Sequence, residues 1–147
     1  MLYALTPANR LVCQVCLSTG LRVGDVLAIR TESLKKQFTI IEQKTGKKKR
    51  IRLSEALYAE LRAQAGEYYV FEHRTDPHRH RTRQAVYADV KRACKAFRLK
   101  ANVTPHSLRK AYAVKLMRKY GDIAKVREAL NHESDLVTML YAFSDLI

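Results

Sequence analysis

The chain has 147 residues, of which 47% are hydrophobic, and it carries a formal net charge of +14 at pH 7. This length and composition suit one folded domain with a buried core and exclude a disordered polymer. The positive charge does not suit a small enzyme that acts on a neutral metabolite. It favours a polyanionic partner, and nucleic acid is the commonest of these.

Capping and apolar patterns predict three helices and three strands in residues 1–64. In chain order these are a helix over residues 7–18, a short helix from residue 22, a short strand near 28–31, strands over 38–43 and 48–53, and a helix after residue 54. Thr6 and Pro7 supply a cap and a first helical position. Gly46, in KTGK, marks the turn of a hairpin between the two longer strands.

The second half of the chain is predicted to be mostly helical. After an irregular stretch over residues 72–81, helices are expected from about residue 83, over 105–119, over 122–130, and from 134 onward. The predicted fold class is therefore mixed, mainly α with a small three-stranded antiparallel β-sheet, in a single domain over residues 1–147.

The cysteines and the apolar segments indicate the compartment. An odd number of cysteines, Cys13, Cys16 and Cys94, without a secretory signal predicts a reducing, cytoplasmic setting. The Cys13-x-x-Cys16 spacing also occurs in redox and metal sites, but its apolar surroundings, RLVCQVCL, favour two buried small hydrophobic residues. No apolar stretch approaches the roughly 18 residues of a membrane-spanning helix. We expect a cytoplasmic protein, nucleoid-associated in a prokaryote or its phage, with no membrane partner.

Two clusters of basic residues lie in the hairpin segment KTGKKKRIR and in the loop over residues 73–83. Asp76 is the only acidic residue of that loop, so ion pairing cannot neutralise it. The clusters are either solvated surfaces or contacts to the phosphates of double-stranded DNA, and we favour DNA. The predicted DNA contacts are Lys47, Lys48, Lys49, Arg50, Arg79, Arg81 and Arg83. The loop's histidines lack nearby cysteine or carboxylate partners, and we predict no metal and no cofactor.

Residues 104–110, TPHSLRK, predict a helix that begins with a basic pair. Thr104 and Pro105 form the start, which puts His106 and Arg109 on one face within the first two turns. A helix N-terminus exposes backbone N–H groups and the positive end of the helix dipole, which favours phosphate. A titratable base and a guanidinium there suit a phosphodiester, although a lone H-x-x-R more often lies on a solvated helix face.

Three further stretches join this motif to make a set. STGLRVGDVL contains Arg22, EQKTGKKKR contains Lys44, and ALNHESDLVTMLYAF contains His132 and Tyr141. Their order and gaps, 23 residues from Arg109 to His132 and nine from His132 to Tyr141, resemble the catalytic domain of the tyrosine recombinases, the phage-integrase family. Taken alone, each motif is weak: Tyr141 also fits a core aromatic residue, and His132 a helix end.

The resemblance implies a site-specific recombinase or integrase that cleaves and rejoins DNA strands through a covalent 3′-phosphotyrosine, without metal or ATP. It assigns Tyr141 as the nucleophile, His106 as the general base and His132 as a hydrogen-bond donor to the phosphate. Arg22 and Arg109 are suited to clamping the non-bridging oxygens of the phosphate. The family places the donor of a proton to the departing 5′-oxygen at Lys44, with Lys47 and Lys48 as rivals.

The sequence departs from the family pattern at three residues, one of which is Arg52, where a proline commonly follows the third strand. Asp25 stands where glutamate is more usual, and it can still brace the site. Asn131 replaces the usual glycine before His132, and asparagine tolerates the left-handed backbone of a helix end. The N-terminal DNA-gripping domain of the family is expected to be absent. The expected assembly is a tetramer on DNA and a monomer in isolation. Three alternatives stay open: a type IB topoisomerase, a DNA-binding remnant or regulator without activity, and a metal-dependent nuclease.

Overall fold

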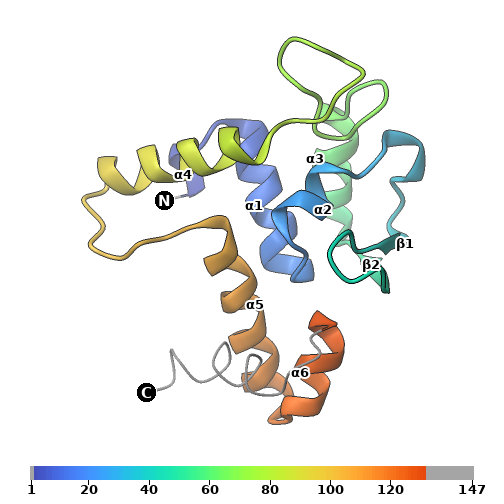
Figure 1. Ribbon diagram of the computed structural model, residues 1–147, viewed down its shortest axis with the longest axis vertical. Coiled ribbons are helices and arrows are strands. Elements are labelled where there is room, and N and C mark those ends of the chain that lie inside the picture. The colour runs from blue at the N-terminus through green and yellow to red at the C-terminus, as the bar shows by residue number, and fades with distance from the viewer. Residues whose placement is uncertain (1, 132–147) are drawn as a thin grey trace.

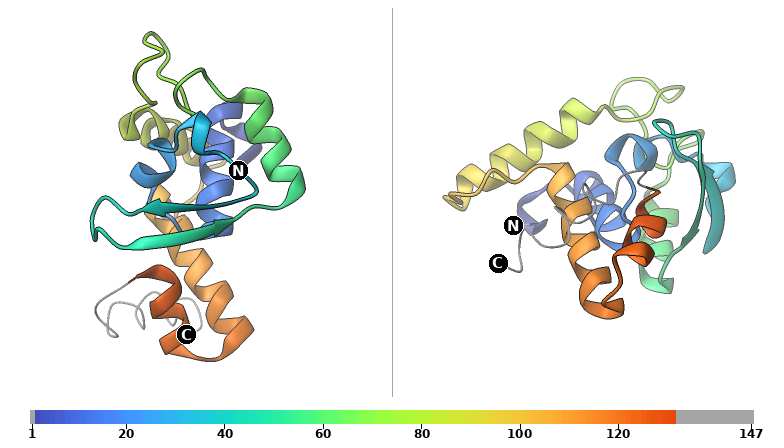
Figure 2. Two further views of the ribbon diagram at one scale, coloured as in Figure 1. Left: turned by 90° about the vertical axis from the view of Figure 1, so that its right-hand side faces the viewer. Right: turned by 60° about the horizontal axis from the view of Figure 1, so that its bottom comes forward.

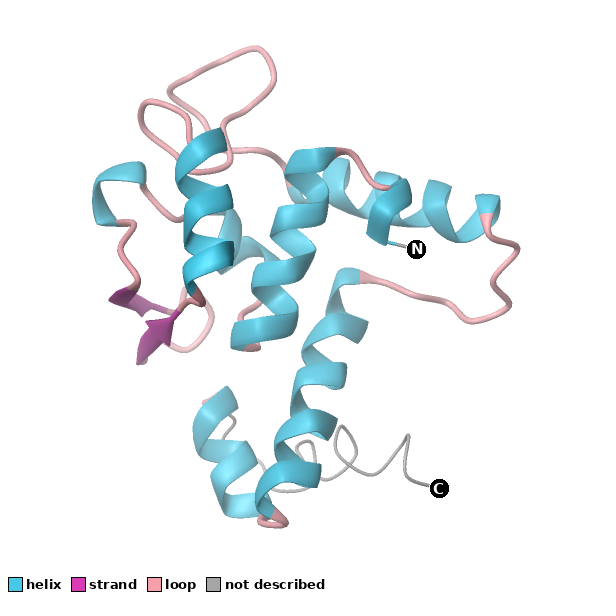
Figure 3. Cartoon of the chain, turned by 180° about the vertical axis from the view of Figure 1, so that it is seen from behind, coloured by secondary structure: helices cyan, strands magenta, loops and turns pink. Residues whose placement is uncertain are grey.

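The computed structural model describes residues 2–131. Its elements, in chain order, are η1 (Leu2–Ala4), α1 (Pro7–Thr19), α2 (Val23–Leu27), η2 (Thr31–Ser33), β1 (Gln37–Ile41), β2 (Lys48–Arg52), α3 (Glu55–Gln64), α4 (Arg83–Ala96), α5 (Pro105–Tyr120) and α6 (Ile123–Leu130). The helices dominate, and the strands form one small hairpin (Figures 1 and 3). The predicted fold class, mainly α with a small antiparallel sheet, is confirmed.

Helix α1 lies at the centre of the main core. It contacts α2, α3, α4 and α5, and its buried apolar residues are Leu11, Val12, Cys13, Val15 and Cys16. Cys13 and Cys16 are free thiols within this core, so the interpretation of the C-x-x-C spacing as a buried apolar pair is confirmed. Burial raises the pKa of the Cys13 thiol to about 11, which keeps it protonated and unreactive.

A smaller apolar cluster joins the last two helices of the described chain. Ala113 of α5 packs there with Val126 and Leu130 of α6, and all three are fully buried. Helix α6 lies beside the C-terminal half of α5, away from α4 (Figures 1 and 2). This packing holds α6 against α5.

The hairpin differs from the prediction in its number of strands. Strands β1 and β2 pair antiparallel, from Gln37 opposite Arg52 to Ile41 opposite Lys48, and Gly46 lies in the turn with a φ of 68°. The predicted third strand near residues 28–31 is wrong for the described chain. Arg30 makes a single antiparallel bridge to Tyr69, and the 3-10 turn of η2 then ends the extended backbone.

The predicted helices are found within one or two residues of their expected bounds, apart from the one predicted from residue 134, which lies outside the described residues. Ser54 and Thr82 cap α3 and α4 by accepting hydrogen bonds from Leu57 N and Ala85 N. Phe97, which follows the last residue of α4, is 54% exposed. None of the described helices is long and apolar enough to cross a membrane.

Candidate active site

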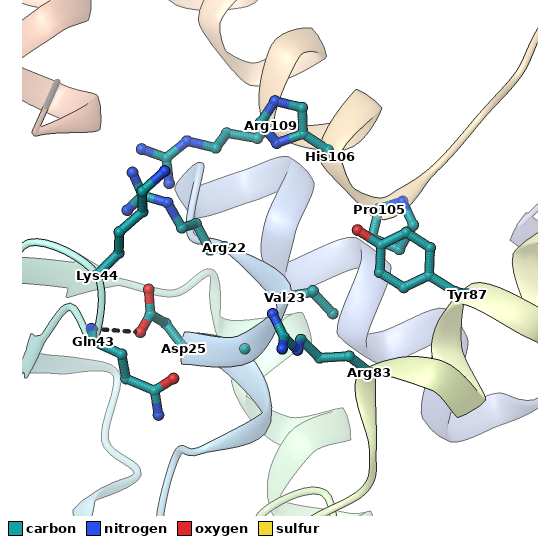
Figure 4. A pocket seen from close by; sticks show the side chains of 11 residues that line it. Arg22, Val23, Asp25, Gln43, Lys44, Arg83, Tyr87, Pro105, His106 and Arg109 are labelled. Carbon is teal, nitrogen blue, oxygen red and sulfur yellow. Dashed lines mark hydrogen bonds between the residues drawn. The ribbon is translucent and has the colours of Figure 1, made fainter.

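A cavity of about 470 Å³ brings together residues that are far apart in the sequence. It is lined by Arg22, Lys44, His106 and Arg109, with Asp25 from α2 and with Arg83 and Tyr87 from α4. Figure 4 shows the side chains of Arg22, Lys44 and Arg109 converging on one side, with His106 beside Arg109. The structure therefore brings together four of the six residues predicted to be catalytic.

The end of α1 determines the position of Arg22. The helix stops at Gly20, whose φ of 72° is left-handed, and a β-carbon there would lie 2.3 Å from Cδ1 of Tyr112. Glycine is therefore required both by the backbone conformation and by the close approach of the tyrosine ring. The chain then turns at the buried Leu21, and Arg22 occupies the N-cap position of α2 with its side chain 22% exposed.

Arg109 projects from the second turn of α5 into the interior. It is 1% exposed and is the largest fully buried side chain among the described residues. Its Nη2 donates a hydrogen bond of 2.6 Å to the carbonyl oxygen of Leu130, the last residue of α6. A guanidinium has five N–H donors in a fixed plane, and this anchor uses one of them.

His106 lies one turn before Arg109, on the exposed side of the cavity. Its pKa is lowered, first by desolvation and then by the positive charges of Arg109, Arg22 and Lys44. A lowered histidine pKa keeps the imidazole neutral at neutral pH, with one ring nitrogen able to accept a proton. The electrostatics of the cavity therefore suit a general base at this position.

Asp25 lies below the arginines and is 5% exposed. Its Oδ1 accepts a hydrogen bond of 2.9 Å from the backbone N–H of Gln43, while Oδ2 is buried with no hydrogen-bond partner among the described residues. Burial raises the pKa of the carboxyl, against the opposing effects of the Gln43 hydrogen bond and the arginines. The protein thus keeps an acidic group beside its cations although the fold disfavours its charge.

This burial predicts that Asp25→Asn stabilises the fold at neutral pH. The raised pKa means that the folded state binds the carboxyl proton more tightly than the unfolded state, so the free energy of unfolding falls as pH rises above the unfolded pKa of about 4. The amide has no such charge, and we expect the melting temperature of Asp25→Asn at pH 7 to be about 2 °C higher than that of the wild type. Thermal unfolding at pH 7 and pH 4 measures this. The gain should shrink at the lower pH, whereas a less stable variant at pH 7 would show that attraction to the arginines dominates.

Glu42 is a member of the site that the sequence interpretation missed. It follows β1 directly, is fully buried, and its Oε2 accepts a hydrogen bond of 2.9 Å from Nη1 of Arg22. The strand pattern contained a signal for it: Phe38 and Ile40 of β1 face inward, and a period of two places Glu42 on the same face. An acid on the apolar face of a strand is rare unless it is paired.

The hairpin lysines separate into different environments. Lys44, Lys47 and Lys48 are all exposed, but Lys44 also lines the cavity. Lys49 points inward, and its Nζ donates a hydrogen bond of 2.6 Å to the carbonyl oxygen of Thr19. Burial, together with the charges of Arg109 and Arg22, lowers the pKa of Lys49 to about 8.

The other predicted DNA contacts also differ in their exposure. Arg50 and Arg79 are exposed, and Arg81 is half-buried. Arg83 is exposed at the start of α4 and lines the cavity. Within residues 2–131, no three histidine, cysteine, aspartate or glutamate side chains are grouped as they would be around a metal ion.

The last part of the predicted site lies outside the described residues. His132 and Tyr141 fall within residues 132–147, so their roles stay predictions. Asn131, directly before them, ends α6 with a left-handed φ of 52°. Asparagine thus adopts there the conformation for which the family's glycine is suited.

Comparison with known proteins supports one family for this arrangement. The model of the phage integrase family matches residues 3–146. The integrase of Escherichia phage P2 is 29% identical over 143 residues, which cover 97% of this chain and 40% of that integrase. Tyrosine recombinase XerD of Lacticaseibacillus casei is 27% identical over 150 residues, covering 90% of this chain and 49% of XerD. The chain thus spans less than half the length of either relative.

A solved structure shares the fold. The XerH site-specific recombinase bound to its difH substrate superimposes with a TM-score of 0.74 over 92% of this chain and 42% of XerH, at 22% identity. The family model spans nearly the whole sequence, and the fold agrees with it. The chain belongs to the phage integrase family.

Proposed function

We propose that this chain forms the catalytic part of a site-specific DNA recombinase or integrase, which cleaves and rejoins DNA strands through a covalent 3′-phosphotyrosine. The single observation that carries the proposal is the convergence of Arg22, Lys44, His106 and Arg109 on one cavity. Attack on a phosphodiester builds negative charge on its non-bridging oxygens. Two guanidiniums fixed around that position stabilise this charge without reorganising.

The remaining steps follow from proton transfer. A tyrosine hydroxyl ordinarily has a pKa near 10, so Tyr141 needs a base to become a nucleophile at neutral pH. A neutral His106 accepts that proton, and His132 donates a hydrogen bond to the phosphate. Lys44 gives a proton to the departing 5′-oxygen. The phosphotyrosine keeps the energy of the broken ester bond, so rejoining needs no ATP, and the arginines do the work of a metal ion.

Double-stranded DNA is the proposed partner. The exposed cations Lys47, Lys48, Arg50, Arg79 and Arg83 fit phosphate contacts that hold the duplex against the cavity. We infer assembly as a tetramer on DNA and action in the cytoplasm, on the nucleoid or on a mobile element such as a phage.

A covalent-trap assay tests this function. Random duplex DNA that carries bridging 5′-phosphorothiolate links is incubated with the protein in EDTA, denatured in detergent, and separated on a gel. The expected result is a protein–DNA adduct, because the thiolate leaves without reattacking the phosphotyrosine. A chain that binds DNA but forms no adduct, even with an added N-terminal DNA-gripping domain, would contradict the proposal.

The same substrates test Lys44 as the proton donor. With an ordinary phosphodiester, Lys44→Ala is expected to slow cleavage by about 10²- to 10⁴-fold, the usual contribution of a general acid. With the 5′-thiolate leaving group, which departs without a proton, the variant should cleave at nearly the wild-type rate. Lys47→Ala and Lys48→Ala are the matched controls, since they remove the same charge from exposed positions of the hairpin. If Lys47→Ala or Lys48→Ala instead slows cleavage of the phosphodiester and regains the wild-type rate with the 5′-thiolate, that lysine is the proton donor.

A further inference from the structure

The buried carboxylate of Glu42 is the feature that the proposed reaction does not yet use. It is 0% exposed and is not among the residues that line the cavity. Its Oε2 forms an ion pair of 2.9 Å with Nη1 of Arg22, whose side chain does reach the cavity. A buried carboxylate is costly unless it is paired and hydrogen-bonded, so these contacts hold both side chains in place.

The turn that carries Lys44 is also built around Glu42. The backbone N–H of Glu42 donates to the carbonyl oxygen of Lys47 at 2.9 Å, and its own carbonyl oxygen accepts from Gly46 N at 2.8 Å. The hydroxyl of Thr45 donates to Oε2 at 3.2 Å. The backbone and the side chain of one residue therefore close the turn and connect it to Arg22.

The second carboxylate oxygen reaches the end of α6. Oε1 accepts a hydrogen bond of 3.2 Å from Nδ2 of Asn131, the residue that ends this helix. Arg109 donates a hydrogen bond to the preceding carbonyl, that of Leu130. Arg22 and Arg109 are thus connected to the same end of α6, one through Glu42 and the other directly.

We propose that Glu42 is a positioning residue, which orients the guanidinium of Arg22 toward the scissile phosphate and fixes its distance from the donors of Arg109. The inference rests on the proposed function. The pair uses Nη1 of Arg22 and leaves the cavity side of the guanidinium to the phosphate. Rigid placement of a clamp matters because a displacement of about 1 Å at a reacting centre costs on the order of 10²-fold in rate.

Glu42→Gln tests this role with a nearly unchanged shape. The amide removes the charge that attracts Arg22 and adds N–H donors to a group that already accepts from Arg22, Thr45 and Asn131. We expect the rate of adduct formation in the covalent-trap assay to fall by about 10²-fold, while the Kd for duplex DNA changes by no more than about twofold. Glu128→Gln is the matched control, because it removes the same charge from an exposed position near the end of α6, and it should keep the wild-type rate.

The choice of leaving group distinguishes a defect at Arg22 from a defect at the neighbouring Lys44. A defect in the Arg22 clamp slows cleavage of the ordinary phosphodiester and of the 5′-thiolate by the same factor, since both build the same charge. Equal slowing of both substrates is therefore expected for Glu42→Gln. Full rescue by the thiolate would overturn the proposal and place the effect of Glu42 in the Lys44 turn instead.

Two further outcomes are decisive. A folded Glu42→Gln variant that forms adduct at the wild-type rate would overturn the role of Glu42 and leave the proposed function intact. A wild-type protein that binds DNA but forms no adduct, even with an added N-terminal DNA-gripping domain, would overturn both. If Glu42→Gln is unfolded at the assay temperature, Glu42→Asp replaces it. That variant keeps the charge but withdraws it by one methylene, and the same loss of rate at unchanged DNA affinity is expected.

Discussion

Replacing Arg109 by lysine is expected to slow adduct formation by on the order of 10³-fold, the range seen when a fixed donor to a developing oxyanion or phosphoryl charge is removed. Lysine keeps the positive charge but replaces the planar fork with one flexible ammonium. That ammonium cannot both bond the carbonyl oxygen of Leu130 at 2.6 Å and present a parallel pair of donors to the phosphate. The measurement is the rate of adduct formation with a saturating concentration of the 5′-phosphorothiolate DNA.

The control for Arg109→Lys lies on the same helix. Arg118 is exposed near the end of α5, and Arg118→Lys should leave both the rate and the melting temperature unchanged. The Arg109 variant should also unfold a few degrees earlier, because one anchor of α6 is weakened in a fully buried position. A variant that loses stability but cleaves at the wild-type rate would show that Arg109 holds α6 and does not bind the phosphate.

The parts of the fold that sequence reasoning predicted are those with local signals. Ser54 and Thr82 mark the starts of α3 and α4, because a helix start needs acceptors for its free N–H groups and these lie within three residues. Pro7 and Pro105 mark the starts of α1 and α5, because proline suits the first helical position. The left-handed end at Asn131 is also a local matter. The one strand that was wrongly predicted, near residues 28–31, depends on a distant partner, Tyr69, which offers a single bridge.

The candidate site was predicted only in part, for a related reason. The spacing of the H-x-x-R motif identifies its residues in the sequence, but no local pattern identifies the partners that orient the site. The contact of Arg22 with Glu42 spans 20 positions, and that of Glu42 with Asn131 spans 89. Such pairs follow from how α6, the hairpin and α2 pack together. The inward direction of Lys49 likewise depends on a distant partner, the carbonyl oxygen of Thr19 at the end of α1, and a run of four basic residues does not distinguish Lys49 from its exposed neighbours.

The largest effect is expected for Tyr141→Phe, which should abolish the covalent adduct. The substitution removes the one oxygen that would form the bond to phosphorus, so no rearrangement of the clamp can restore the reaction. It changes no charge at neutral pH, and the Kd for duplex DNA should stay at the wild-type value. Loss of the adduct with unchanged DNA binding separates a missing nucleophile from a missing binding surface.

The cavity itself supplies the sharpest control for this assignment. Tyr87 of α4 lines the same cavity as Arg22, His106 and Arg109, so its hydroxyl is the rival that the described structure offers (Figure 4). We expect Tyr87→Phe to form adduct at close to the wild-type rate, because the resemblance places the nucleophile nine residues after His132. Mapping the peptide that stays attached to DNA in the adduct then decides between the two hydroxyls. An adduct that persists in Tyr141→Phe and disappears in Tyr87→Phe would transfer the nucleophile to α4 and require a different order of steps around the same arginine clamp.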